Sequence, residues 1–339
     1  MTALLELRNV RKVFGGGLFS RGQTIAVDGL TFSVAEGPPS ITAIVGESGS
    51  GKTTMARLLL GLVAPTSGEV CYRGKNLRKL SGGERRQFLR DVQVIFQDPY
   101  EVYNPFYKVD HVLETPIRQM KLASSREEEH EQIVTALRAV GLRPDETLGR
   151  FPHQLSGGQR QRIMVARALL LKPRVIIADE PVSMVDASLR ATILESLTAL
   201  NREFGISLIY ITHDLTTAYQ VAENIIVLYR GTVAEAGDVE RVVKDPRHPY
   251  TQLLIGSIPL PDPNRPWHNE EREGSIDIDI HRGCPFANRC PRVMERCRER
   301  PPLYRVDENR AASCFVYSEK PILAADHLDE TFVGHATAR

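Results

Sequence analysis

The strongest constraint on this 339-residue chain is a glycine-rich stretch between an apolar run and a helical pattern. Residues 46–53 read Gly-Glu-Ser-Gly-Ser-Gly-Lys-Thr, which fits the phosphate-loop pattern GxxxxGK[ST]. Apolar residues 41–45 precede it as an expected buried strand, and residues 53–60 follow as an expected helix. Glycines allow the backbone N–H groups to converge on phosphate oxygens, and the helix N-terminus adds a positive dipole. This order predicts a nucleoside triphosphate site rather than a glycine-rich turn with a chance lysine.

Two side chains of this loop have individual expected tasks. Lys52 supplies a mobile positive charge for the phosphates, and Thr53 supplies a hydroxyl for Mg²⁺. The predicted nucleotide-binding residues are Gly46, Glu47, Ser48, Gly49, Ser50, Gly51, Lys52, Thr53 and Thr54.

Composition excludes several classes of protein. The net charge is only +1, so there is no electrostatic case for binding nucleic acid or an anionic membrane. No apolar stretch approaches the roughly 18 residues that span a bilayer, and the N-terminus lacks the regions of a signal peptide. We therefore expect about two domains and, for any membrane process, action from the cytoplasmic side through a partner.

A second short apolar strand ends in two acids. Residues 174–181 read Arg-Val-Ile-Ile-Ala-Asp-Glu-Pro. On a parallel sheet, this strand would place Asp179 beside the phosphate loop, where its carboxylate can hold Mg²⁺ through water. Glu180 would then polarise the water that attacks the γ-phosphate. The competing interpretation is an ordinary acidic turn after a buried strand.

The stretch before this strand decides between the two interpretations. Residues 155–162 read Leu-Ser-Gly-Gly-Gln-Arg-Gln-Arg and lead into an apolar helical pattern at 163–170. Here the chain resembles the nucleotide-binding subunits of ABC transporters, and the resemblance covers nearly all of it. It implies that Ser156, Gly157, Gly158 and Gln159 form a signature motif that contacts the γ-phosphate held by an opposing subunit. Physically, this is another group of N–H donors at a helix N-terminus.

A second copy of the motif, Leu-Ser-Gly-Gly-Glu at residues 80–84, lies in the wrong context. It stands between the phosphate loop and Gln97, and no apolar strand ending in Asp-Glu follows it. We interpret it as a turn before a charged helix.

The resemblance implies roles for four further residues. Phe14 stands where the family places an aromatic ring that stacks on adenine, and Gln97 matches the glutamine that reaches Mg²⁺ and hinges the helical subdomain. His213 matches the histidine that holds the γ-phosphate and orients the catalytic acid. Asp186 matches the aspartate of a loop that communicates across the dimer, although residues 183–186 read Ser-Met-Val-Asp instead of the commoner Ser-Ala-Leu-Asp.

The expected fold is an α/β, ABC-type P-loop NTPase core with an antiparallel β subdomain, an inserted α-helical subdomain and a small cysteine-containing tail. Alternating runs at 4–13 and 25–34 predict two antiparallel strands. Buried strands are expected at 175–178, 208–211 and 225–228, with a helix at 189–204, so the sheet is parallel. The expected division is a nucleotide-binding domain at 1–256, with its helical subdomain at about 100–172, and an extension at 257–339 that starts with a proline-rich linker.

The tail narrows the family. Residues 246–251 read Pro-Arg-His-Pro-Tyr-Thr and resemble the His-Pro-Tyr segment of oligopeptide-type importer ATPases. Four of the five cysteines follow: Cys284, Cys290, Cys297 and Cys314. Clustered cysteines in a cytosolic chain favour metal over disulfides, and the CxxC pairs of a zinc ribbon are missing. The resemblance implies a [4Fe–4S] cluster, while Zn²⁺ and reduced structural thiols remain alternatives. The fifth, Cys71, is expected to be a small buried residue.

One chain carries one phosphate loop and one signature motif, yet a working site needs the loop of one subunit against the signature of another. We therefore expect an ATPase that dimerises with itself or with a second, similar ATPase subunit. The resemblance implies two transmembrane permease subunits, an external binding protein, a place on the cytoplasmic face of the membrane, and import driven by ATP hydrolysis.

Peptides are the cargo that the resemblance favours. The sequence of residues 103–113 also resembles that of family members that import oligosaccharides, so an oligosaccharide cargo remains an alternative. A soluble ABC ATPase of DNA repair or translation is less favoured, because such chains carry two cassettes or a long coiled coil. A small-molecule kinase would give no reason for the signature motif.

Overall fold

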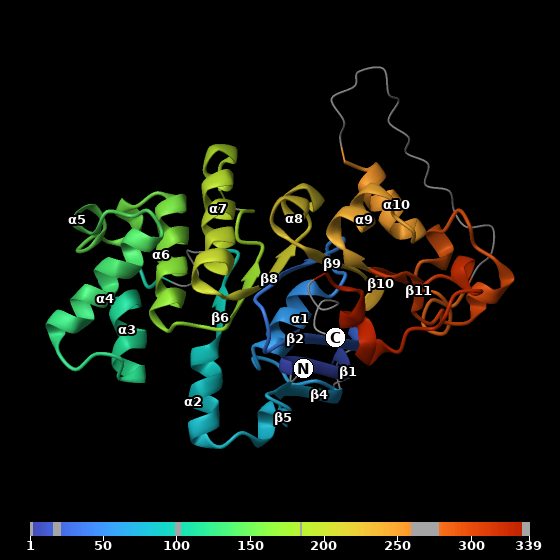
Figure 1. Ribbon diagram of the computed structural model, residues 1–339, viewed down its shortest axis with the longest axis horizontal. Coiled ribbons are helices and arrows are strands. Elements are labelled where there is room, and N and C mark those ends of the chain that lie inside the picture. Colours follow the sequence, from blue (N-terminus) through green and yellow to red (C-terminus); the bar gives the residue numbers. More distant parts are fainter. Residues whose placement is uncertain (1–2, 16–21, 99–102, 184, 259–277, 334–339) are drawn as a thin grey trace. The chain divides into compact units, whose positions relative to one another are not determined.

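The computed structural model describes residues 3–15, 22–98, 103–183, 185–258 and 278–333, apart from the side chains of residues 187 and 188. The chain forms two compact units (Figure 1). The first comprises Met1–Glu36, Thr42–Gly74 and His213–Arg339, and the second comprises Gly37–Ile41 and Lys75–Thr212. The proline-rich stretch expected as a linker lies outside the described residues, as does Met184.

The first unit opens with an antiparallel sheet. Strand β1 (Ala3–Gly15) lies between β2 (Gln23–Ala35) and β4 (Ser67–Tyr72). In β1, Leu5 pairs with Val34 of β2 and Leu7 with Phe32, and all four side chains are buried. The two antiparallel strands predicted from alternation are confirmed; strict alternation of buried side chains occurs at Leu30, Phe32 and Val34 of β2 and is interrupted by register shifts along β1. Cys71 is buried in β4, as expected.

A second group of strands in this unit carries the phosphate loop. Strand β3 (Ile41–Val45) pairs in parallel with β9 (Asn224–Tyr229), and both strands are buried along their whole length. β9 turns back into the antiparallel β10 (Thr232–Asp238). Such unbroken burial explains why both strands read as continuous apolar runs in the sequence.

The described part of the tail extends this sheet. Strand β12 (Arg310–Ala312) pairs with β10, and β11 (Tyr304–Asp307) pairs with β12, both antiparallel. The tail also buries large rings, among them Phe286 and Phe315. The open edge of β10 supplies the backbone partners for these tail strands, and the small Ala311 and Ala312 pack with no exposed surface.

Helices complete the first unit. They are α1 (Lys52–Leu59), α8 (Leu215–Val221), α9 (Val239–Lys244) and α10 (Pro249–Gly256). Short 3₁₀ segments, including η4 (Ala287–Arg289), occur in the tail.

The second unit contains a parallel group of strands and the helical subdomain. Strand β7 (Val175–Asp179) lies between β6 (Val92–Ile95) and β8 (Ser207–Thr212), and α7 (Ala187–Phe204) connects β7 to β8 as the expected βαβ crossover. Figure 1 shows the helices of residues 110–170 gathered together. They are α3 (Asp110–Met120), α4 (Arg126–Ala139), α5 (Pro144–Thr147) and α6 (Gly157–Leu170).

The second LSGG copy lies in this unit and behaves as predicted. After the short β5 (Lys75–Asn76), Ser81 caps the charged helix α2 (Gly82–Asp91). Ser81 Oγ accepts the N–H of Glu84, and the Glu84 carboxylate accepts the N–H of Ser81 at 2.7 Å. This reciprocal capping box explains the motif as a helix start.

Among the helices of the described ranges, none combines the length and the apolar character that crossing a bilayer would require.

Candidate functional site

The phosphate loop runs from the end of β3 to the start of α1. Gly46 has φ 152°, and a Cβ on it would lie 2.2 Å from the Leu228 carbonyl oxygen. Gly51 has φ 105°, and a Cβ on it would lie 2.3 Å from the Ala26 carbonyl oxygen. Only glycine fits either position, so the backbone path of the loop depends on these two residues.

The loop presents the groups that an anion requires. The Lys52 ammonium is buried and donates to the carbonyl oxygens of Gly46, at 2.8 Å, and Glu47, at 3.0 Å. Thr53, in the first turn of α1, is exposed. That turn contains no acidic residue, so nothing on the helix opposes the positive end of its dipole. The arrangement suits a phosphate group.

Three predicted residues meet at one edge of the second unit. Asp179 ends β7, Glu180 follows it, and Gln97 lies two residues beyond β6. Parallel pairing of Ile95 with Ala178 brings the ends of the two strands together. The Gln97 amide donates to the Glu180 carboxylate at 3.1 Å.

The backbone holds Glu180 in an uncommon conformation. Its φ is 47°, in the left-handed region that a residue with a side chain rarely adopts. Its N–H donates to the Ile211 carbonyl of β8 at 2.8 Å, and its carbonyl accepts from the Ser183 hydroxyl at 3.0 Å. These bonds hold Glu180 in its strained backbone conformation. Such strain is common at functional sites, where the backbone fixes the direction of a side chain.

The signature motif begins α6. Ser156 Oγ accepts the N–H of Gln159 at 3.2 Å, and the Gln159 side chain accepts the N–H of Ser156 at 2.9 Å. The two glycines differ in their surroundings. A Cβ on Gly158 would lie 2.8 Å from a Leu189 methyl group of α7, whereas a Cβ on Gly157 would meet no described atom within 4 Å. Gly158 therefore has a packing reason to be glycine, and Gly157 has none.

The remaining predicted residues lie in both units. In the first unit, Phe14 is 41% exposed with the Lys12 ammonium 4.9 Å from its ring centroid, and His213 is exposed between β8 and α8. In the second, Asp186 precedes α7, and its carbonyl accepts from the N–H groups of Leu189 and Arg190.

The four tail cysteines lie in the first unit. Cys284, Cys290 and Cys297 are buried and Cys314 is half-buried, and the Cys284 N–H donates to the Cys297 carbonyl at 2.9 Å. Burial, with a smaller contribution from the neighbouring cysteines, raises the pKa of the Cys284 thiol to about 12 and that of Cys314 to about 11. Within the described ranges, no three His, Cys, Asp or Glu side chains are arranged to hold a metal ion. As placed, the side chains do not fit a cluster, so metal ligation stays a prediction.

Sequence reasoning missed two contacts on the phosphate loop. The Tyr250 hydroxyl accepts the N–H of Glu47 at 2.8 Å, and the Arg289 guanidinium contacts the Glu47 carboxylate at 2.9 and 3.1 Å. The His-Pro-Tyr segment was a visible signal for Tyr250, but it carried no indication of what the ring touches.

Comparisons with known proteins agree with this geometry. The family model "ABC transporter" matches residues 27–183, and "Oligopeptide/dipeptide transporter, C-terminal region" matches residues 234–297. The di/tripeptide transport ATP-binding protein DppF of Pseudomonas aeruginosa is 40% identical over 93% of this chain and 98% of its own length. The chain belongs to the ABC transporter ATP-binding family.

Other members of this family support the assignment. The oligopeptide transport ATP-binding protein OppF of Salmonella typhimurium is 39% identical over 85% of this chain and 87% of its own length. A dimeric post-hydrolysis state of the ATP-binding cassette MJ0796, bound to ADP and phosphate, shares the fold. Its TM-score is 0.61 at 31% identity, with 69% of this chain and 98% of that chain covered. The predicted ABC-type α/β core is therefore confirmed, and the chain is an ATPase of this family.

Proposed function

We propose that this ABC ATPase powers a binding-protein-dependent importer of oligopeptides. The observation that carries the proposal is the presence, in one chain, of an ABC cassette and the oligopeptide/dipeptide transporter C-terminal region. Relatives that match over most of the chain are named as di/tripeptide and oligopeptide transport ATP-binding proteins.

The roles of the predicted ATP-site residues are proposed one by one. Lys52 and the loop N–H groups hold the β- and γ-phosphates, while Phe14 stacks on adenine and His213 contacts the γ-phosphate. Glu180 accepts a proton from the attacking water, and the 3.1 Å bond from Gln97 aims its carboxylate.

Magnesium fits the chemistry of the proposed donors. Thr53, Gln97 and Asp179 offer a hydroxyl, an amide oxygen and a carboxylate, the hard oxygen ligands that Mg²⁺ prefers together with water and phosphate. When bound, the ion neutralises charge on the transferring phosphoryl group.

Dimerisation is proposed because a working site needs the phosphate loop of one subunit and the signature motif of another. A helix N-terminus such as that of α6, with Ser156 at its cap and Gly157 open, suits the γ-phosphate held by a second subunit, and Asp186 would communicate across that interface. The partner is a similar ATPase chain or a second copy. Two permeases would place the pair at the cytoplasmic face of the membrane, with a binding protein outside.

We keep as a proposal the division into a nucleotide-binding domain at 1–256, with its helical subdomain at about 100–172, and a C-terminal extension at 257–339. We also keep the proposal that Cys284, Cys290, Cys297 and Cys314 ligate a [4Fe–4S] cluster, with Zn²⁺ as the alternative. The grouping of four cysteines in one region of the tail supports a metal site. The positions of their side chains in this structure do not fit one. Iron and sulfide analysis of protein purified without oxygen tests it, with a Cys290→Ser variant as control. Fewer than one metal ion per chain, of either kind, would remove it.

Reconstitution tests the cargo. The chain is assembled with its partner ATPase and permeases in liposomes, and ATP hydrolysis is measured with binding protein loaded with di- to pentapeptides or with oligosaccharides. We expect peptide-dependent stimulation that Glu180→Gln abolishes. Stimulation by oligosaccharides alone would overturn the peptide assignment and leave the ATPase role intact.

A further inference from the structure

Glu47, the second residue of the phosphate loop, is held at each of its polar groups. Its N–H donates to the Tyr250 hydroxyl, and its carbonyl accepts from the Ser50 N–H at 3.1 Å and from Lys52 at 3.0 Å. Its two carboxylate oxygens contact the two terminal nitrogens of Arg289. Two of these three polar groups, the N–H and the carboxylate, are held by residues more than 200 positions away, in the C-terminal part of the chain.

Tyr250 is itself rigidly placed. Its side chain has no exposed surface, and its ring centroid lies 4.4 Å from that of Tyr229 and 5.5 Å from that of Phe286. Its N–H donates to His248 Nδ1 at 3.0 Å, and the His248 N–H donates to the buried Glu235 carboxylate at 2.8 Å. A hydroxyl on such a ring is a fixed acceptor for the loop.

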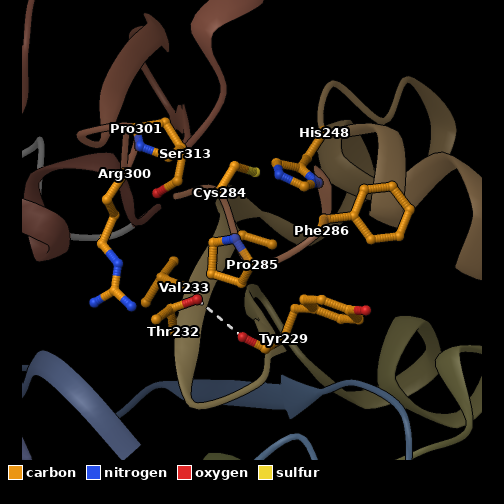
Figure 2. Close-up of a pocket in the computed structure, with 11 residues that line it drawn as sticks. Tyr229, Thr232, Val233, His248, Cys284, Pro285, Phe286, Arg300, Pro301 and Ser313 are labelled. Carbon is orange, nitrogen blue, oxygen red and sulfur yellow. Dashed lines mark hydrogen bonds between the residues drawn. The ribbon is translucent and has the colours of Figure 1, made fainter. Parts of the chain in front are cut away.

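Arg289 reaches the loop from the tail. It lies one residue before Cys290, and its guanidinium carbon is 5.8 Å from the Phe286 ring centroid and 5.9 Å from that of Tyr229. Figure 2 shows Cys284, Pro285 and Phe286 lying against Tyr229, Thr232 and Val233 of the β9–β10 hairpin, with Cys284 beside His248. The tail segment 284–290 thus joins the core hairpin to the phosphate loop.

We propose that Tyr250 and Arg289 are positioning residues, through which the C-terminal segment holds the phosphate loop in its ATP-binding conformation. Two physical effects follow. A loop fixed in advance does not lose conformational freedom when the triphosphate binds, so the apparent affinity rises. Arg289 also neutralises Glu47, whose carboxylate would otherwise repel the phosphates. The inference rests on the proposal that residues 46–54 hold ATP.

Mg-ATP binding to the full-length chain, measured by titration calorimetry, tests the inference. We expect Arg289→Ala to weaken binding about fivefold, which is the upper range for a partly exposed ion pair. Tyr250→Phe leaves the Glu47 N–H without its partner and should weaken binding about tenfold. In the assembled transporter, KM for ATP should rise while kcat changes less than twofold, because the catalytic carboxylate is untouched.

Two controls separate loop positioning from tail stability. Arg300 pairs with Asp28 of β2 at 2.7 Å, is 40% exposed against 44% for Arg289, and does not touch the loop, so Arg300→Ala should leave ATP affinity unchanged. In a Glu47→Gln background, Arg289→Ala should lose most of its effect, because the charge that it neutralises is gone. Melting temperature without nucleotide is recorded for every variant.

The outcomes are distinguishable. The positioning role would be overturned if Arg289→Ala and Arg300→Ala lost ATP affinity equally. It would also be overturned if the single variants Arg289→Ala and Tyr250→Phe both kept the wild-type ATP affinity. Normal ATP binding by Lys52→Ala would instead overturn the proposed ATP site itself. A Tyr250→Phe variant that fails to fold leaves the test to Arg289 and its double-variant cycle.

Discussion

Replacing Glu180 by glutamine isolates the chemistry of one carboxylate. The change keeps the size and shape of the side chain. The new side-chain carbonyl can still accept the 3.1 Å hydrogen bond from Gln97, and the backbone bond from the Glu180 N–H to Ile211 is unaffected. The backbone strain at φ 47° should be about the same for glutamine as for glutamate, because both residues carry the same Cβ. What is lost is the ability to take a proton.

The magnitude follows from that single loss. General-base catalysis contributes a factor on the order of 10² to 10⁴, which corresponds to about 2.7–5.5 kcal/mol in activation free energy. We therefore expect Glu180→Gln to slow ATP hydrolysis at least about 100-fold. The free energy of unfolding should change by less than about 0.5 kcal/mol, because no buried contact is removed.

Single-turnover hydrolysis and ATP binding by the assembled transporter provide the assay. Binding should be retained, and the ATP-bound dimer should accumulate because it cannot proceed. Glu195→Gln, the same chemical change at an exposed position on α7, is the matched control. Turnover of Glu180→Gln within a few-fold of wild type would refute the assignment of Glu180 as the base. A parallel loss of ATP binding would show that the carboxylate serves the ground state instead.

Three further predictions test other parts of the structure. Lys52→Ala should abolish measurable ATP binding in calorimetry while the fold, followed by circular dichroism, is kept; unchanged affinity would contradict the phosphate-loop assignment. Gly157→Ala should leave the melting temperature within about 1–2 °C of wild type yet impair hydrolysis by the dimer. Gly158→Ala should be less stable than Gly157→Ala, by on the order of 1 kcal/mol, because its Cβ would displace the end of the Leu189 side chain; equal stabilities would contradict the packing argument. Burial raises the pKa of Glu235 to about 7 and lowers that of His248 to about 4. The stability linked to Glu235 is present below the pKa of this residue in the unfolded chain and is lost as the pH rises towards 7. The stability linked to His248 is present above its pKa in the unfolded chain and is lost as the pH falls towards 4. The two effects therefore oppose each other between about pH 4.5 and 6.5. Glu235→Gln should remove one trend, so the urea midpoint of this variant should rise with pH across that window more steeply than that of wild type; identical slopes would contradict the coupling.

Much of the core could be predicted because its determinants are local. The run 41–45, the glycines after it and the helix at Lys52 specify strand, turn and helix by burial and backbone geometry alone. The same holds for the alternating strands β1 and β2 and for the helix that begins after Ser156. Capping chemistry also made Ser81 and Ser156 look alike, and the structure gives both the same reciprocal bonds. Only the neighbouring motifs in the sequence told the two copies apart.

The arrangement of the tail and its contacts with the phosphate loop could not be predicted. Nothing in the sequence around Glu47 indicates Tyr250 or Arg289, because contacts between segments 203 and 242 residues apart depend on which sheet edge and which aromatic faces the rest of the chain leaves available. The crowding at position 158 likewise becomes visible only when α7 brings Leu189 against it. Local sequence determined the elements and the chemistry of the phosphate loop. The tertiary structure alone decided that the C-terminal segment restrains this loop, because only packing brings the buried Tyr250 ring and the Arg289 guanidinium within hydrogen-bonding distance of one residue.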